Sequence, residues 1–386
     1  MTGFAFQTTP QIEFGAGSVE RLGELARSRA LQHVLLVTDA GLVNAGLVAP
    51  AEGALEAAGV AVTRFDAVSA DPPESVVLEA AAIARDQGVD GVIGLGGGSS
   101  MDVAKLVAVL AHGEQPLSEM YGVDQVRGGR LPLIQVPTTA GTGSEVTAVS
   151  IVTTGATTKM GVVSPQLFAD LAVLDPALTL GLPPAATAST GIDAMVHAIE
   201  AYTSRHRKNP YSDMLARQAL TLMSRSLRQA VHQGDDMAAR GDMLLGAMLA
   251  GQAFANAPVA AVHALAYPLG GHYHVPHGLS NALVLLPVLQ FNAPAAAGLY
   301  AELLPCMDPQ EPGRMLDATA GCDAFVQALD KLIEDVALPR TLRTQGVTGD
   351  ALPMLAAEAM KQQRLLINNP REVGEADALA IYRSVH

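Results

Sequence analysis

The most constraining feature of this 386-residue chain is the regular alternation of strand-like and helix-like segments over its first 180 residues or so. Short aliphatic runs are followed by longer runs whose apolar residues recur every three or four positions. This alternation predicts an α/β fold, in which a parallel sheet carries helices on both faces. The predicted strands are His33–Val37, Val60–Phe65, Gly91–Leu95 and Leu131–Val136, and the predicted helices are Ala51–Gly59, Ser75–Gln87 and Ser100–His112.

The pattern changes at Leu182-Pro183-Pro184, after which helical periodicity dominates and turn residues separate the helical runs. We therefore predict an α/β domain over residues 1–180, followed by an all-helical domain over residues 181–386. The helices predicted in the second domain are Ile192–Thr203, Ser212–Gln233, Met237–Asn256, Val262–Leu269, His277–Gln290, Gly313–Ala337 and Ala376–Val385.

Composition limits the partners and the location of the protein. The chain has 24 basic and 38 acidic side chains and a formal net charge of −14, which argues against nucleic acid and anionic membrane surfaces as partners. Met1–Pro10 lacks the basic and apolar regions of a targeting segment. Apolar stretches such as Ala282–Leu289 are far shorter than the ~20 residues that cross a bilayer. We expect a cytoplasmic protein with no membrane partner.

A glycine-rich turn, GLGGGSSMDVAK at 94–105, lies between the third predicted strand and its helix. Three consecutive glycines, Gly96–Gly98, allow a close approach of the backbone to a ligand. Ser99 or Ser100 can cap the helix, whose N-terminus attracts a phosphate. A tight turn that binds nothing is the alternative.

The usual dinucleotide fingerprint is not matched, because the third glycine of GxGxxG would fall on Met101 or Ser99. The acid that binds the ribose normally follows the turn by ~20 residues. Here the best candidate is Asp39, which ends the strand His33–Val37 and precedes the turn. Asp39 could equally be a helix cap. A nucleotide could therefore bind by similar physics, although not in the standard order.

A second candidate ligand segment follows the strand Leu131–Val136 and reads PTTAGTGSE at 137–145. Its hydroxyl groups and glycines offer hydrogen-bond donors without charge, which suits a pyrophosphate or a ribose. An ordinary hydroxyl-rich loop explains the same residues.

The helical half contains one carboxylate and several histidines with the chemistry of metal ligands. Asp193 and His197 are four residues apart in a helical run, so both project from one face. With His263 and His277 they would form an Asp/His set that suits iron(II) or zinc. The chain has only two cysteines, which excludes a four-cysteine zinc site. Each of these residues alone has an ordinary core or surface explanation, and spacing does not say which histidines bind metal.

Taken together, these segments resemble the iron-containing (group III) alcohol dehydrogenase family, within the dehydroquinate synthase-like fold. The resemblance spans nearly the whole chain and rests on four motifs: GGGSSMDVAK at 96–105, PTTAGTGSEVT at 137–147, GIDAMVHAIEAY at 191–202 and the stretch from His263 to Asn281. It implies a nucleotide-binding α/β domain and a helical, metal-bearing catalytic domain. It also implies that the protein oxidises small alcohols or reduces aldehydes with NAD or NADP.

The resemblance assigns roles residue by residue. The metal positions of the family are matched by Asp193, His197, His263 and His277. Its pyrophosphate turn is matched by Gly96, Gly97, Gly98 and Ser99, with Asp102 just beyond, and its second cofactor segment by Thr138, Thr139, Thr142 and Ser144. Lys159 resembles the lysine that reaches the nicotinamide ribose. Asp39 matches the acid that favours NAD over NADP, because a carboxylate accepts from a ribose 2′-OH and repels a 2′-phosphate.

The chain departs from the family where many relatives have a histidine four residues after the third metal ligand, since this position is Tyr267. We expect Tyr267 and His277 to be the catalytic side chains, with proton relay through another histidine or water, or simple packing of Tyr267, as alternatives. For the substrate site we expect Phe254 as an apolar wall and His272 as a lining residue, with core packing and a surface position as the alternatives. Asp71 is a further candidate neighbour of the cofactor.

The resemblance thus implies a metal-dependent alcohol dehydrogenase or aldehyde reductase that uses NAD and Fe(II), alternatively Zn(II), and forms a homodimer or larger homo-oligomer. A dehydroquinate synthase-like lyase needs many basic residues, whereas the helical half has only three lysines, Lys208, Lys331 and Lys361. A maleylacetate reductase-like enzyme would need the metal less. A metal-dependent hydrolase would leave the glycine turn unused, and a non-catalytic nucleotide-binding protein would turn over no alcohol.

Overall fold

The computed structural model describes residues 3–155, 158–307 and 316–386. The chain forms two compact units, and the first comprises Thr8–Leu180. Its main sheet has six parallel strands in the order β1-β9-β6-β4-β2-β3, and a smaller sheet has the order β5-β8-β7. The main strands are β1 Ile12–Phe14, β2 His33–Val37, β3 Ala61–Phe65, β4 Gly91–Gly96, β6 Leu133–Pro137 and β9 Leu171–Leu174, and the smaller sheet holds β5 Gly122–Val123, β7 Val149–Thr154 and β8 Thr158–Val163.

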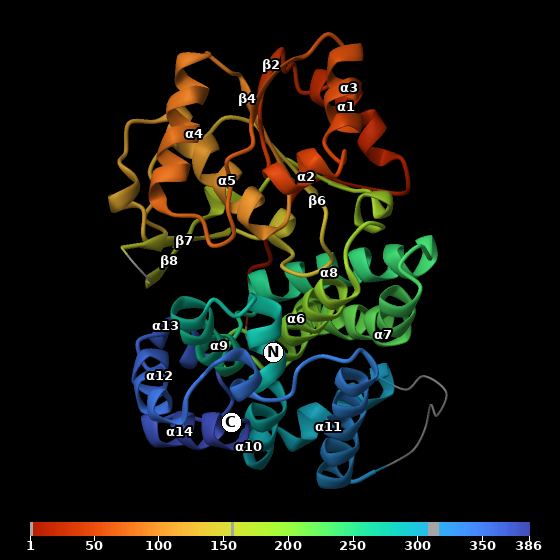
Figure 1. Cartoon of the computed structure of the whole chain (residues 1–386), viewed down its shortest axis with the longest axis vertical. Coiled ribbons are helices and arrows are strands. Elements are labelled where there is room, and N and C mark those ends of the chain that lie inside the picture. Colours follow the sequence, from red (N-terminus) through yellow and green to blue (C-terminus); the bar gives the residue numbers. More distant parts are fainter. Residues whose placement is uncertain (1–2, 156–157, 308–315) are drawn as a thin grey trace. The chain divides into compact units, whose positions relative to one another are not determined.

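Helices cover both faces of the main sheet, because successive strand residues point to opposite sides. Leu35 and Val37 of β2 belong to one buried cluster, which includes residues of α4 and α5, whereas Val34 and Leu36 belong to another with residues of α1 and α3. Figure 1 shows α4 and α5 on one side of β2 and β4, and α1 and α3 on the other. The helices of this unit are α1 Leu22–Arg27, α2 Ala40–Asn44, α3 Ala49–Ala57, α4 Glu74–Asp86 and α5 Gly98–His112.

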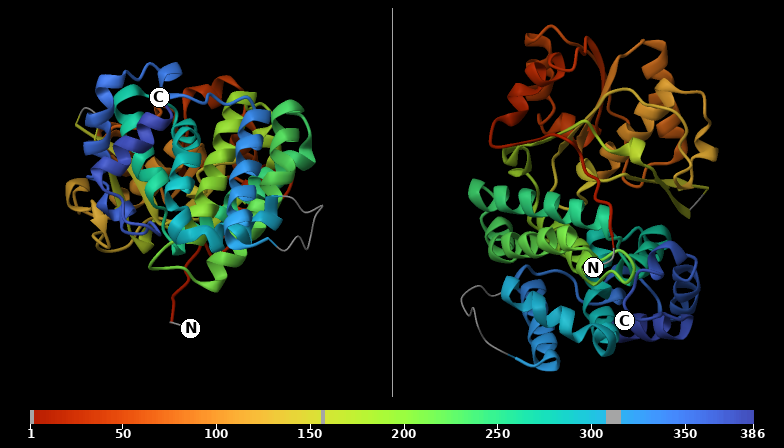
Figure 2. Two further views of the ribbon diagram at one scale, coloured as in Figure 1. Left: turned by 90° about the horizontal axis from the view of Figure 1, so that it is seen from below. Right: turned by 180° about the vertical axis from the view of Figure 1, so that it is seen from behind.

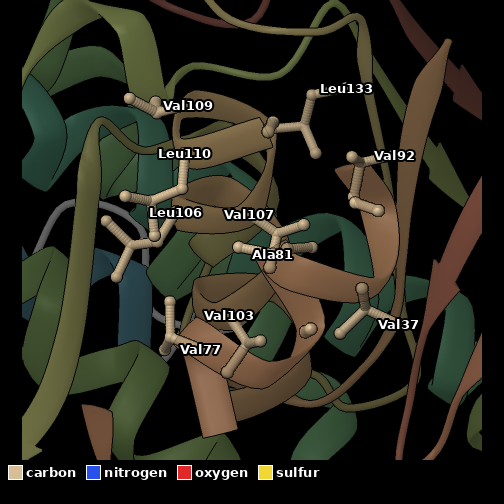
Figure 3. Packing of buried hydrophobic residues seen from close by; sticks show 14 of the residues in the cluster. Val37, Val77, Ala81, Val92, Val103, Leu106, Val107, Val109, Leu110 and Leu133 are labelled. Atoms are coloured by element: carbon tan, nitrogen blue, oxygen red, sulfur yellow. The ribbon is translucent and has the colours of Figure 1, made fainter. Parts of the chain in front are cut away.

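Aliphatic side chains from α5 and the strands fill the first of these clusters (Figure 3). Val103 and Val107 of α5 lie toward Val37 and Val92 of the neighbouring strands, and all four side chains are fully buried. Burying such a side chain contributes about 1.5–3 kcal/mol. This packing fixes the start of α5 at the end of β4.

The second unit combines Gly181–His386 with the residues up to Gln7 and is helical. Its green to blue helices pack side by side (Figures 1 and 2). Helix α6 contacts α7, α8 and α10, and its residues from Gly191 to Thr203 are all buried. The helices are α6 Pro184–Thr203, α7 Pro210–His232, α8 Met237–Asn256, α9 Ala261–Tyr273, α10 His277–Met307, α11 Ala318–Asp335, α12 Leu352–Ala359, α13 Gln363–Leu366 and α14 Glu375–Ser384.

The predicted fold class is confirmed, and the predicted strands and helices lie close to observed elements. The first unit begins at Thr8 rather than at the predicted residue 1, because the residues up to Gln7 belong to the helical unit. The Gln7 backbone bonds to the Asn256 side chain through both its N–H and its C=O, and the rings of Phe4 and Phe6 lie 6.0 and 5.3 Å from that of Tyr211. The predicted helix 313–337 is observed from Ala318 to Asp335, and its first three residues lie outside the described residues.

Helix α10 is much longer than the apolar stretch Ala282–Leu289 that it contains. Among the described helices, α10 alone is long and apolar enough to cross a bilayer, and α8 and α9 pass the same test together but bend by 107° between them. Helix α10 contacts α6, α7, α9, α11 and α14, as the central helix of a folded unit does. The helix continues through Pro287, Pro294 and Pro305 and so joins apolar runs that are separate in the sequence.

Candidate active site

Four side chains of the helical unit converge with metal-binding atoms directed at one another. Asp193, His197, His263 and His277 each offer one ligand atom, and these four atoms lie within 4.8 Å of one another. Asp193 Oδ1 is 3.8 Å from His263 Nε2 and 3.6 Å from His277 Nε2. The first three residues are buried, whereas the His277 side chain is 33% exposed. One carboxylate with three imidazoles fits an iron(II) or zinc ion.

Three helices bring these ligands together. Helix α6 supplies Asp193 and His197 one turn apart, α9 supplies His263, and α10 begins at His277. Gly278 lets α10 approach α6 closely, since a Cβ at this position would lie 2.3 Å from the backbone oxygen of Ser189. A larger residue there would push His277 away from Asp193.

Asp193 is held as a carboxylate. Burial raises the pKa of this group, but electrostatic interactions with His197, His277 and His263 and a hydrogen bond from Asn281 outweigh burial and hold the pKa below its usual value. The Asn281 amide nitrogen lies 2.5 Å from Asp193 Oδ1 and 3.3 Å from His263 Nε2. It also lies 3.4 Å from His277 Nε2, and the spacing of residues in the motif His263–Asn281 does not predict this position beside three ligands.

Two of the three other expected catalytic or substrate residues lie against the ligand cluster. The Phe254 ring stacks on His197 with ring centroids 4.3 Å apart, and the Tyr267 ring lies 6.0 Å from that of His277. His272 is exposed in the last turn of α9 and is not one of the four metal-ligand candidates. Its expected place in the substrate site stays a prediction.

In the α/β unit, the predicted cofactor segments meet at one edge of the sheet. Strands β2, β4 and β6 are parallel neighbours, so the residues that follow them lie at the same edge. Asp39 follows β2, the glycine turn follows β4, and Thr138 follows β6. The Thr138 N–H donates to Gly96 O at 3.0 Å, and a Cβ at Gly98 would lie 2.8 Å from the Thr142 methyl group. The glycines thus allow the second segment to pack directly on the first.

The expected helix cap at Ser99 or Ser100 is wrong, because α5 begins at Gly98, two residues before the predicted start at Ser100. Gly97 is its N-cap, and no side chain of the described residues caps it. Ser99 and Ser100 lie in the first turn, which leaves this N-terminus to a ligand. Asp39 is itself the N-cap of α2 and accepts from Leu42 N at 3.0 Å.

Asp102 and Ser144 bond to each other in a buried network. Asp102 accepts from Ser144 Oγ at 2.6 Å and from Ile151 N at 2.8 Å. Lys105, which the sequence reasoning did not single out, donates to Ser144 Oγ, Thr147 Oγ1 and Val149 O at 2.7, 3.1 and 2.7 Å. The network ties α5 to the second cofactor segment.

Burial lowers the pKa of the Lys105 ammonium to about 8, although Asp102 and Glu145 oppose the shift. Burial raises the pKa of Glu145 to about 7. Away from this network, Lys159 lies 2.5 Å from Asp71 Oδ1, so these two expected cofactor neighbours pair with each other.

A parallel α/β unit and a helical unit with an Asp/His cluster are the features expected of a metal-dependent dehydrogenase. Comparison with known proteins agrees over both units. Residues 9–176 match the family described as "Iron-containing alcohol dehydrogenase", and residues 187–386 match "Fe-containing alcohol dehydrogenase family, C-terminal". The chain belongs to the iron-containing alcohol dehydrogenase family and is an oxidoreductase.

Three similar proteins illustrate the breadth of the family. The chain is 41% identical to long-chain-alcohol dehydrogenase 1 of Geobacillus thermodenitrificans over 97% of this chain and 95% of the relative. A crystal structure of 1,3-propanediol oxidoreductase has a TM-score of 0.96 and 35% identity over the full length of both chains. Sulfoacetaldehyde reductase from Bifidobacterium kashiwanohense, solved in complex with NAD+, has a TM-score of 0.88 and 29% identity over 100% of this chain and 99% of that one.

These similarities favour the alcohol dehydrogenase prediction over the lyase, hydrolase and non-catalytic alternatives.

Proposed function

We propose that this protein transfers a hydride between NAD(H) and a primary alcohol or its aldehyde, at a divalent iron or zinc site. The cluster of Asp193, His197, His263 and His277 carries the proposal. Their ligand atoms lie within 4.8 Å of one another, and the chain belongs to a family of iron-containing enzymes. An ion held by them would supply Lewis-acid polarisation of the alcohol or aldehyde oxygen.

The chain's own residues would bind and orient the two reactants. The backbone N–H groups at the start of α5 would bind the pyrophosphate of NAD, and Thr138, Thr139 and Thr142 would donate hydroxyl hydrogen bonds to it. The related sulfoacetaldehyde reductase was solved in complex with NAD+, which supports NAD as the cofactor. Asp102 and Ser144 would hold the second segment in place through their mutual bond, rather than binding NAD directly. Lys159 would bind the nicotinamide ribose after its ion pair with Asp71 breaks.

On the helical unit, the exposed edge of His277 would face the substrate. Phe254 would form an apolar wall beside His197, and Tyr267 would accept or donate the hydroxyl proton near His277. A phenol has a reference pKa of ~10, so it is a weaker base near neutral pH than the histidine found in many relatives.

Metal reconstitution tests the proposal. The protein is stripped of metal, loaded anaerobically with Fe(II) or Zn(II), and assayed with NAD and NADP. The panel contains short and long primary alcohols, 1,3-propanediol and sulfoacetaldehyde, since relatives are named for such substrates. We expect metal-dependent NADH formation from at least one alcohol. Full activity in the metal-free protein would contradict the proposal.

Asp39→Asn tests the basis of NAD preference. Asparagine caps a helix as well as aspartate does, so the cap of α2 should survive while the negative charge is lost. We expect the preference for NAD over NADP to fall at least about tenfold, because repulsion of a 2′-phosphate is removed. The ratio of kcat/KM for the two cofactors measures the change. An unchanged ratio would refute the role given to Asp39.

We also infer a cytoplasmic protein that forms a homodimer or larger homo-oligomer and has no nucleic-acid or membrane partner. The net charge of −14 supports the absence of polyanionic partners. Light scattering after gel filtration would report the mass of the assembly.

A further inference from the structure

A buried carboxylate outside the ligand cluster lies directly behind one of its histidines. Glu200 belongs to α6, three residues after His197, and is only 4% exposed. A buried carboxylate is costly unless it is paired or accepts hydrogen bonds, so its partners reveal what it does.

Both oxygens of Glu200 bind the start of α9. Oε1 accepts from the backbone N–H of Val262 at 2.7 Å, and Oε2 lies 2.6 Å from His263 Nδ1. Helix α9 has Ala260 as its N-cap, and no side chain of its own N-cap residue can satisfy the first N–H groups. The carboxylate from α6 takes this place, and the same contact positions the ring of the adjacent histidine.

This contact decides which nitrogen of His263 carries the proton. An ionised carboxylate can only accept hydrogen bonds, so Nδ1 must be the donor. In the neutral ring the lone pair is then on Nε2, the nitrogen that lies 3.8 Å from Asp193 Oδ1 in the ligand cluster. Only this tautomer can bind a metal ion through Nε2.

We propose that Glu200 is a positioning residue, which fixes the tautomer and ring orientation of His263 for metal binding. The inference rests on the proposed function, because it assumes that the cluster holds a metal ion. The negative charge of Glu200 would also favour metal binding, since Glu200 and Asp193 together would offset the two positive charges of a divalent ion. Partners of this kind change metal affinity by about 10–100-fold.

Glu200→Gln is the sharpest test, because glutamine keeps the size of the side chain but has a single acceptor oxygen. Val262 N–H and His263 Nδ1–H then compete for one oxygen. If that oxygen binds Val262, the amide NH₂ faces Nδ1 and favours the tautomer with a proton on Nε2. We expect Zn(II) affinity, measured by chelator competition, to fall about 10–100-fold.

A matched control is Glu302→Gln, which also alters a carboxylate bonded to α6. Glu302 accepts from the Tyr202 hydroxyl at 2.5 Å and is not a member of the ligand cluster. This variant should bind Zn(II) as the wild type does. A loss common to both variants would indicate a general effect on α6 and would overturn the specific role of Glu200.

A second measurement needs no variant. ¹⁵N NMR of the histidine rings in the metal-free wild type should show His263 protonated on Nδ1 and not on Nε2, and a proton on Nε2 would overturn the proposal. If the wild type binds Zn(II) and Glu200→Gln binds it equally tightly, the role of Glu200 is overturned but the metal site is not. Absence of Zn(II) binding in the wild type would overturn the metal site and this inference together.

Discussion

Asp193→Ala should bind Fe(II) or Zn(II) at least about 1000-fold less tightly than the wild type and should lose dehydrogenase activity in parallel. Asp193 is the only carboxylate among the four candidate ligands, so its removal leaves three neutral imidazoles to hold a doubly charged ion. Loss of several kcal/mol of charge stabilisation corresponds to this factor, since each 1.36 kcal/mol is tenfold. The Asn281 amide also loses the acceptor that lies 2.5 Å away.

Metal content after reconstitution and NADH formation from an alcohol are the measurements. Asp213→Asn is a suitable control. Asp213 lies on α7, forms an ion pair with Lys208 at 2.7 Å and is not a member of the ligand cluster. NADH binding, followed by fluorescence, should survive in Asp193→Ala, since the proposed cofactor segments belong to the α/β unit. Retention of both metal and full activity in Asp193→Ala and His263→Ala would show that the metal site is wrongly assigned.

The parts of the fold that could be predicted are those where local pattern and burial agree. Strand β2 is predicted with its observed bounds because Val34–Val37 is a continuous apolar run buried on both faces. The antiparallel strands β7 and β8 are not predicted, because Val149–Thr154 and Thr158–Val163 contain threonines and mostly partly buried residues rather than a continuous apolar run. Strand β9 was also missed, since four residues between two aspartates give too short a pattern.

The four metal-ligand candidates could be found because Asp193 and His197 share a helix and the motif that contains them is specific. Their partners could not be found in this way. Glu200 meets His263 from a position 63 residues away, and Asn281 meets Asp193 from a position 88 residues away. Such pairs depend on how α6, α9 and α10 pack, which local spacing does not determine.

Lys105→Met should destabilise the α/β unit by about 3–5 kcal/mol, the cost of removing one partner from a buried ion pair. The Lys105 side chain is fully buried, and its ammonium lies 3.7 Å from Asp102 Oδ1. Methionine keeps most of the volume but leaves the Asp102 carboxylate and the acceptors Ser144 Oγ and Val149 O without this donor. Because Ser144 belongs to the second cofactor segment, NAD binding should weaken as well.

Urea unfolding followed by circular dichroism measures this loss, with Lys331→Met as the control. Lys331 is a surface residue that pairs with Glu334 and Asp335, so its replacement should leave the free energy of unfolding unchanged within error. The double variant Asp102→Asn/Lys105→Met should recover part of the loss, because no unpaired charge remains. Wild-type stability in Lys105→Met would refute the role of the network.

The contribution of Lys105 to the free energy of unfolding should increase with pH. The folded-state pKa of Lys105 is about 8, below its usual 10.5, so between these values the unfolded chain binds more protons at this group than the folded chain does. Stability from Lys105 therefore rises with pH through this window. Lys105→Met lacks the titrating group, so the difference in unfolding free energy between wild type and variant should widen from pH 8 to pH 10, roughly this window. A constant difference would mean that Lys105 titrates normally and is not held in the buried network.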